Sequence, residues 1–94
     1  MTTLEICAGG IEDCINAQAA GAHRIELNSA LHLGGLSPSL AVLTQAVKKI
    51  DIPIICMVRP RGAGFCYNEL EKEVMFEDAK IFLEAGAKGL AFGF

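Results

Sequence analysis

Charged and polar side chains alternate with apolar ones in three short segments that otherwise have the composition of buried β-strands. The segments are residues 4–7, 24–28 and 54–59. Because side chains alternate faces along a strand, each segment has one apolar face and one face that carries a carboxylate, thiol, amide or guanidinium. A parallel sheet covered by helices on both faces is apolar on both. The alternation therefore predicts that one face lines a barrel where it opens into a site.

Two carboxylates, Glu5 and Glu26, are expected on the same face of adjacent strands. Paired carboxylates can raise the pKa of one member, which suits general acid–base catalysis, and they can supply two oxygen ligands to a metal. The alternative is that the two carboxylates form structural ion pairs with arginines, because such ion pairs shift the pKa of a carboxyl group just as an active site does. Two interpretations stay open: Glu5 or Glu26 acts as a general base, or both neutralise Arg24, Arg59 or Arg61.

A second group of residues indicates a site for an anion. Arg59 and Arg61 follow the third segment at its carboxyl end, where α/β folds carry their sites, and two guanidinium groups can clamp an anion bidentately. The aromatic pair beyond them, Phe65 and Tyr67, could then cover the anion. Gly34 and Gly35 come just before an expected helix start, where free backbone N–H groups favour a phosphate or carboxylate. The alternatives are a structural ion pair for Arg59 and ordinary turn chemistry for the glycines.

Three helices are expected between the strands that position these residues. They cover residues 11–20, residues 38–50 and a longer segment that follows residue 68. Ser37 is the expected N-cap of the second helix, with Pro38 at its first helical position. Asn68 and Glu71 form a capping-box signature at the start of the third. Residues 89–92 then provide a fourth short apolar strand.

The resulting order, βαβαβαβ, predicts an α/β fold with a parallel sheet and right-handed crossovers. A closed (β/α)₈ barrel needs about 200 residues or more, so the 94 residues of this chain form one partial domain with the first four strands of a TIM-barrel-like fold. A small open α/β domain is the alternative. Because a half-barrel has two sheet edges with unpaired backbone groups, we expect a homo-oligomer or pairing with a second half-barrel.

Composition excludes several classes of protein. The chain is 52% hydrophobic and 20% charged, so it is expected to fold around a core. Its net charge is -3 and its basic residues are scattered, which argues against a nucleic-acid or anionic-membrane partner. No basic leader or long apolar run is present, so a cytoplasmic location is expected.

The four cysteines show no CxxC pair and no disulfide-scaffold spacing, so reduced thiols are expected. Cys7, Cys14 and Cys56 lie in strand or helix patterns, where free cysteine usually behaves as a small buried hydrophobe. Cys7 and Met57 fall on the polar face, and a thiolate with a thioether is the soft pair that selects Cu(I), although a core role is commoner for such residues. His23 lies at the start of a strand and His32 in a loop, and their spacing is not that of metal ligands. Both are therefore expected at the surface.

Four motifs together resemble the CutC family, whose name refers to copper homeostasis. The motifs are residues 4–7, 24–27, 34–39 and 59–62, the last followed by residues 65–67. The resemblance implies a TIM barrel of which this chain matches the N-terminal half. It also implies Cu(I) as the bound ion, with Cys7 as the soft ligand and Glu26 and Asn28 nearby, since Asn28 stands where the family often has cysteine.

Three hypotheses about function follow. The first is a CutC-like protein associated with copper homeostasis that binds copper(I). The second is a TIM-barrel enzyme, or a remnant of one, in which Arg59 and Arg61 hold a small anionic or phosphorylated substrate and Glu5 or Glu26 acts as the base. The third is a non-catalytic half-barrel that folds by pairing with another chain.

Overall fold

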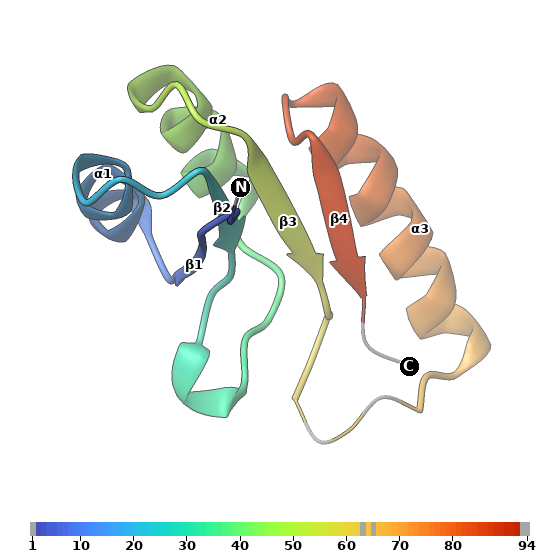
Figure 1. Ribbon diagram of the computed structural model, residues 1–94. Helices are drawn as coiled ribbons and strands as arrows, with labels where there is room; N and C mark the ends of the chain where they lie inside the picture. The colour runs from blue at the N-terminus through green and yellow to red at the C-terminus, as the bar shows by residue number, and fades with distance from the viewer. Residues whose placement is uncertain (1, 63, 65, 93–94) are drawn as a thin grey trace.

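The computed structural model describes residues 2–62, 64 and 66–92 of the chain. Strands and helices alternate along it, with one short 3₁₀ helix, η1 (Figure 1). The elements are β1 (Glu5–Ala8), α1 (Ile11–Ala19), β2 (Arg24–Leu27), η1 (Leu31–Leu33), α2 (Leu40–Lys49), β3 (Ile54–Val58), α3 (Glu69–Glu84) and β4 (Gly89–Phe92). The predicted order βαβαβαβ is confirmed.

The four strands form one parallel sheet in the order β1-β2-β3-β4. The register places Cys7 level with Glu26, Glu26 level with Ile55, and Ile55 level with Gly89. Each strand therefore adds to the same growing edge of the sheet. This one-directional order is the one that sequential right-handed βαβ crossovers produce.

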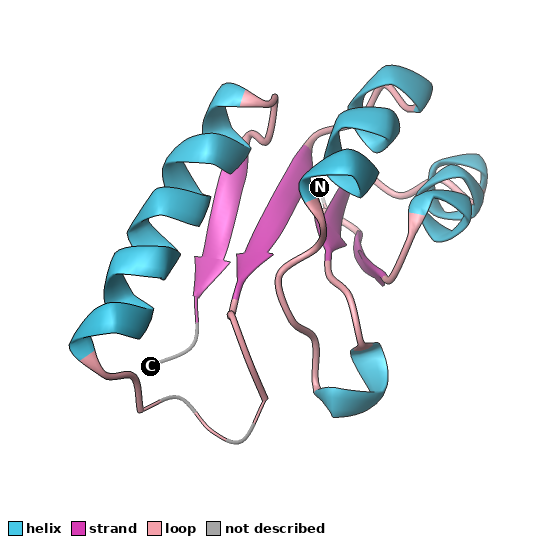
Figure 2. Cartoon of the chain, turned by 180° about the vertical axis from the view of Figure 1, so that it is seen from behind, coloured by secondary structure: helices cyan, strands magenta, loops and turns pink. Residues whose placement is uncertain are grey.

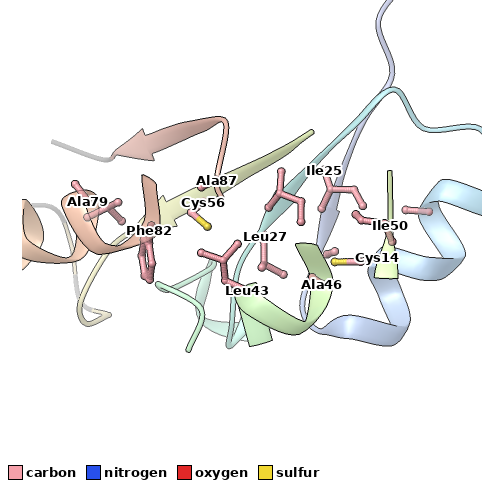
Figure 3. Close-up of a cluster of buried hydrophobic side chains, with 14 of the residues drawn as sticks. Cys14, Ile25, Leu27, Leu43, Ala46, Ile50, Cys56, Ala79, Phe82 and Ala87 are labelled. Carbon is pink, nitrogen blue, oxygen red and sulfur yellow. The ribbon is translucent and has the colours of Figure 1, made fainter. Parts of the chain in front are cut away.

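All three helices cover one face of this sheet, which we call the covered face (Figure 2). Its core contains side chains from the strands and from each helix, drawn in Figure 3. Ile25, Leu27, Leu43 and Cys56 have no exposed surface. Each fully buried aliphatic side chain of this size contributes about 1.5–3 kcal/mol of transfer free energy, so the covered face supplies most of the fold's stability.

The other face of the sheet, which we call the open face, is not covered by any helix of the described residues. Its side chains are those that alternate with the core residues along the strands: Glu5, Cys7, Arg24, Glu26, Ile55, Met57, Gly89 and Ala91. All of them are exposed or only partly buried. The expectation that Cys7 is buried was therefore wrong, because burial in this sheet comes from the helices and Cys7 points away from them. Cys14 and Cys56 are buried as expected.

The predicted helix ends were right for two helices and wrong for one. The capping box of α3 is confirmed, since the Asn68 side chain accepts from the N–H of Glu71 and the Glu71 side chain accepts from the N–H of Asn68. Helix α2, however, begins at Leu40 with Ser39 as its N-cap, and not at Pro38. Ser37 stays outside the helix, and its backbone N–H and hydroxyl are hydrogen-bonded to the backbone of Arg59, just after β3. Within the described residues, no helix has the length and apolarity needed to cross a bilayer.

Candidate functional site

The three residues expected around a metal, Cys7, Glu26 and Asn28, form one cluster at the carboxyl end of β1 and β2. The Cys7 thiol lies 3.7 Å from Glu26 Oε1, to which it donates, and the Asn28 amide nitrogen donates to the same oxygen at 3.2 Å. A second bond, from Asn28 Nδ2 to the Glu26 carbonyl at 3.1 Å, fixes the amide. Glu26 Oε1 is thus the point where thiol and amide converge.

Two factors act on the Cys7 thiol. Partial burial raises its pKa, and the neighbouring carboxylates of Glu26 and Glu5 raise it further, so the thiol form is favoured. Met57 shares the open face with Cys7, but β2 lies between their strands, and Glu26 and Ile55 occupy the level of Cys7. Two strand spacings of about 4.8 Å keep the two sulfur-bearing residues apart, so they do not form a direct soft pair.

Asn28 itself is almost fully buried, with 2% of its surface exposed. Its Oδ1 has no hydrogen-bond partner among the described residues. The oxygen faces the backbone of Gly35, where an added Cβ would lie only 2.5 Å away. Glycine at this position is therefore what allows the loop to close over the Asn28 side chain.

Glu5, the second candidate base, lies one strand away and is paired differently. Its carboxylate forms an ion pair with Arg24, the residue level with it on β2. Both side chains are partly exposed on the open face. The sheet therefore places Glu5 and Glu26 on one face, as predicted, but separates their roles: Glu5 meets a guanidinium and Glu26 meets a thiol and an amide.

Arg59 is buried, with 7% of its surface exposed, under the loop that connects β2 to α2. Its Nη1 donates to the carbonyls of Leu33 at 3.1 Å and Gly35 at 3.3 Å. The Arg59 backbone N–H donates to Ser37 Oγ at 2.8 Å, and its carbonyl accepts from the Ser37 N–H at 2.9 Å. These bonds fasten the β2–α2 loop to the end of β3.

Gly34 and Gly35 lie inside this fastened loop and not at a helix start. Both have a positive φ, 90° and 93°, which closes the chain after η1. The N–H of Gly34 donates to the Leu31 carbonyl and that of Gly35 to the Ala30 carbonyl. The reasoning that placed them before a helix N-terminus was wrong about the helix, because α2 starts five residues after Gly35. The anion-binding role given to them stays a prediction.

Arg61, the other expected anion clamp, holds the loop between β3 and α3. Its Nε and Nη2 donate to the two carboxylate oxygens of Glu71, at 2.5 Å and 3.2 Å. The remaining donors reach the carbonyls of Gly62, Gly64 and Cys66. Its guanidinium also stacks over the Tyr67 ring at 5.0 Å. Phe65, expected to help cover an anion, lies outside the described residues.

The structure thus brings Cys7, Glu26 and Asn28 together and assigns the two arginines to two different loops. Sequence reasoning missed two of the residues involved. Glu71 was identified only as a helix cap, although it also pairs with Arg61, and Ser37 was taken for a cap. A Ser-Pro-Ser sequence offers two possible caps, and only the position of β3 decides which serine is free to act as one.

Metal ligands at the cluster are few. Among the described residues, no group of three or more His, Cys, Asp or Glu side chains is placed to hold an ion. Cys7 offers a soft sulfur, and Glu26 a hard oxygen beside it. Both histidines are exposed, as expected, and the Nδ1 of His23 accepts a hydrogen bond from the Leu4 N–H. At this cluster the described residues therefore offer one sulfur and one carboxylate to a metal.

The comparisons with known proteins agree on one family. The CutC family model matches residues 2–94. A CutC family protein of Treponema denticola is 55% identical over 91 residues, which cover 97% of this chain and 37% of that protein. The human copper homeostasis protein cutC homolog is 43% identical over 90 residues, which cover 96% of this chain and 33% of that protein. The chain therefore spans about a third of the length of these relatives.

Solved structures support the same assignment. The CutC protein of Streptococcus agalactiae superimposes with a TM-score of 0.86 at 34% identity, over 96% of this chain and 44% of that one. A FabK mutant of Thermotoga maritima matches at 12% identity with a TM-score of 0.65, and this likeness concerns the fold alone. The prediction of a half-barrel of the TIM-barrel type is confirmed by the CutC match. The chain belongs to the CutC family.

Proposed function

We propose that this chain takes part in copper homeostasis and that Cys7 binds Cu(I), with Glu26 and Asn28 completing the surroundings of the ion. One observation carries the proposal: the Cys7 thiol points onto the open face and donates to Glu26 Oε1, which Asn28 also contacts. Relatives that align over nearly the whole chain are named copper homeostasis proteins, among them those of human and Caenorhabditis elegans.

The chemistry of the cluster fits a soft monovalent ion. Thiolate sulfur selects Cu(I) over the harder cations that prefer carboxylates and water. Cys7 is exposed, so an ion can reach it, and its thiol must lose a proton when the metal binds. Glu26 Oε1 already accepts a hydrogen bond from that thiol. With one sulfur ligand, we expect a single weakly held ion, which suits transfer more than storage.

Titration with Cu(I) in anaerobic buffer, against a coloured Cu(I) chelator as competitor, tests this proposal. We expect one ion per wild-type chain and loss of that ion in Cys7→Ala. Cys66→Ala is the matched control, because Cys66 is also an exposed free thiol but lies outside the cluster. Equal stoichiometry and affinity in wild type and Cys7→Ala would contradict the proposal.

A second candidate function is favoured by the position of Glu26. Its carboxylate is partly buried at the carboxyl end of β2, where TIM-barrel enzymes carry their catalytic groups, and it has a thiol and an amide as neighbours. In this proposal Glu26 acts as a general base on a small anionic or phosphorylated substrate. The contacts of Arg59 and Arg61 with loop carbonyls and Glu71 favour a positioning role for both over direct contact with the anion.

A thermal-shift screen of sugar phosphates and small carboxylates separates the two candidates. The enzyme proposal expects a compound that raises the melting temperature of wild type and has no effect on Glu26→Gln. Glu12→Gln, an exposed carboxylate on α1, controls for the change in net charge. The absence of any stabilising compound, or equal stabilisation of Glu26→Gln, would count against this second function.

A further inference from the structure

We propose that a cavity at the amino end of the sheet binds a free α-amino acid with a branched aliphatic side chain, such as leucine. The cavity has a volume of about 180 Å³. It lies where α2 leads into β3 and α3 leads into β4, at the end of the sheet from which both arrows start in Figure 1. The Cys7 cluster lies at the opposite, carboxyl end of the strands, so this inference does not depend on the function proposed above.

The apolar part of the lining suits an aliphatic side chain. Ile50 and Ile54 line the cavity and belong to the buried core, while Val47 beside them is partly exposed. Gly86 also lines it, and a Cβ added there would lie 3.1 Å from Val47 Cγ1, so glycine leaves open a space that another residue would fill. A dry apolar cavity of about 150 Å³ holds one benzene molecule. The cavity beside Val47 is therefore large enough for a small branched side chain, whose burial is favourable.

Two opposite charges complete the lining. Asp51 comes from the segment between α2 and β3, and Lys88 comes from the turn between α3 and β4. The Asp51 N–H donates to Gln18 Oε1 at 2.6 Å and the Lys88 N–H donates to the Ile54 carbonyl at 2.8 Å, so the backbone of both residues is fixed. Among the described residues, neither side chain takes part in an ion pair. A carboxylate and an ammonium group beside one apolar floor match the two charged ends of an amino acid.

The carboxyl end of α2 adds to the site for the ammonium group. The last carbonyls of a helix have no partner inside it and carry a partial negative charge. The N–H of Asp51, four residues after Val47, donates to Gln18 instead, and Pro53, four residues after Lys49, has no N–H. The carbonyls of Val47 and Lys49 can therefore accept from a donor outside the helix. We expect the ammonium group of the ligand to lie between these carbonyls and Asp51, with the carboxylate of the ligand on the opposite charge of the lining.

Titration of the isotope-labelled 94-residue chain with L-leucine, followed by NMR, tests the proposal. We expect the chemical-shift changes to be confined to amides within residues 47–54 and 86–88. The dissociation constant for leucine should rise at least tenfold in Asp51→Asn and in Lys88→Gln, since each variant removes the partner of one charged end of the ligand.

Two exposed charges outside the cavity serve as matched controls. Glu12→Gln on α1 and Lys80→Gln on α3 remove the same signs of charge and should bind leucine as wild type does. All four substituted side chains are exposed, so each variant should keep its fold, and its amide spectrum shows this directly. A similar loss of affinity in the controls would mean that net charge and not the cavity governs binding, and would overturn the proposal.

Three analogues test each part of the ligand separately. Glycine keeps both charges without the aliphatic side chain, isoamylamine lacks the carboxylate, and isocaproate lacks the ammonium group. We expect each of them to bind at least tenfold more weakly than leucine. An analogue that binds as tightly as leucine would overturn the proposal. The absence of leucine binding, shift changes at other residues, or an unchanged affinity in Asp51→Asn or Lys88→Gln would overturn it as well.

Discussion

The two faces of the sheet differ in what holds their side chains in place. On the covered face, apolar residues such as Ile25 and Leu27 are excluded from water by three helices. On the open face, Cys7 and Glu26 stay accessible and are positioned by hydrogen bonds to neighbours on the next strand or in the next loop. One face of the sheet therefore carries the buried core, and the other carries the accessible polar side chains.

The strongest test is a cavity on the covered face. Leu43 has no exposed surface, so Leu43→Ala should lower the free energy of unfolding by about 2–5 kcal/mol, the lost transfer term plus the cavity term. Met57 on the open face is only partly buried, and Met57→Ala should lower it by about 1 kcal/mol or less. Urea unfolding followed by circular dichroism measures both. Similar values for the two variants would show that the open face contributes as much as the core.

The reaction rates of the four free thiols should differ between the exposed and the buried positions. Burial raises the pKa of Cys14, and it raises that of Cys56 to about 12, so neither forms a reactive thiolate while the fold is closed. Alkylation of the native chain at pH 8 should therefore modify Cys7 and Cys66 about 100-fold faster than the two buried thiols. Cys66 should react before Cys7, whose pKa is raised.

Mass spectrometry of digested samples follows each thiol separately. The control is the same reaction in denaturant, where all four should react at similar rates. Rapid modification of Cys56 in the native chain would show that the covered face opens easily and would contradict the assignment of stability to it.

Substitutions at Gly35 test how tightly the β2–α2 loop packs against the Asn28 side chain. Gly35 shares a positive φ with Gly21, 93° against 94°, but only Gly35 would bring an added Cβ against Asn28 Oδ1. Both Gly→Ala changes should lower stability by about 1 kcal/mol for the backbone conformation. Gly35→Ala should lose about a further 1–2 kcal/mol for the clash.

A double-mutant cycle measured by urea unfolding isolates that clash. In an Asn28→Ala background, the effect of Gly35→Ala should fall to the value of Gly21→Ala, because the opposing oxygen has been removed. If Gly35→Ala is equally destabilising with and without Asn28, the proposed contact is not what limits this position.

The smallest expected effect concerns the ion pair that holds the β3–α3 loop. The hydrogen bonds that Glu71 accepts from Arg61 hold its pKa below the ordinary value of 4.5. The hydrogen bond from the Asn68 N–H lowers the pKa of Glu71 as well. A carboxyl with a lowered folded-state pKa stabilises the fold above its unfolded pKa and loses this contribution as the pH falls through the folded one. Wild type should therefore lose stability relative to Glu71→Gln as the pH falls below 4.5.

Urea midpoints of both proteins at pH 7, 5 and about 3 measure this effect. The pair is partly exposed, so the difference should be small and should shrink further in high salt. Glu73→Gln, an exposed carboxylate on the same helix, is the matched control. A gap between wild type and Glu71→Gln that is the same at every pH would show that the ion pair does not contribute through charge.

Much of the fold could be predicted from local patterns. The alternation of residues 24–28 correctly separates Ile25 and Leu27 from Glu26, because the side-chain period of a strand is a fixed property of its backbone. The capping box of Asn68 and Glu71 was also predictable, since its two bonds lie within one turn of helix. The grouping of Cys7 with Glu26 on one face follows from the same alternation and from the order of the strands.

The role of each polar residue could not be predicted in this way. Arg59 and Arg61 are chemically identical and two residues apart, yet one is buried beneath the β2–α2 loop and the other pairs with Glu71 on the next helix. Ser39 caps α2 in place of Ser37 for the same reason, because the Ser37 hydroxyl accepts a hydrogen bond from the N–H of Arg59, the residue that follows β3. The hydrogen-bond partner of each of these side chains depends on which segments, distant in the sequence, lie next to one another in the fold.

The sequence by itself determined the strand and helix periods and the apolar side of each element, because these depend on residues close in the chain. The alternation of strands and helices determined the parallel arrangement through the rule of right-handed crossovers. The tertiary structure alone decided which guanidinium closes which loop and that Gly35 must make room for Asn28. The physical reason is the separation along the chain between the residues that interact. Local backbone geometry fixes the period of each element, whereas the partners of a side chain are fixed only once the sheet brings separate segments together.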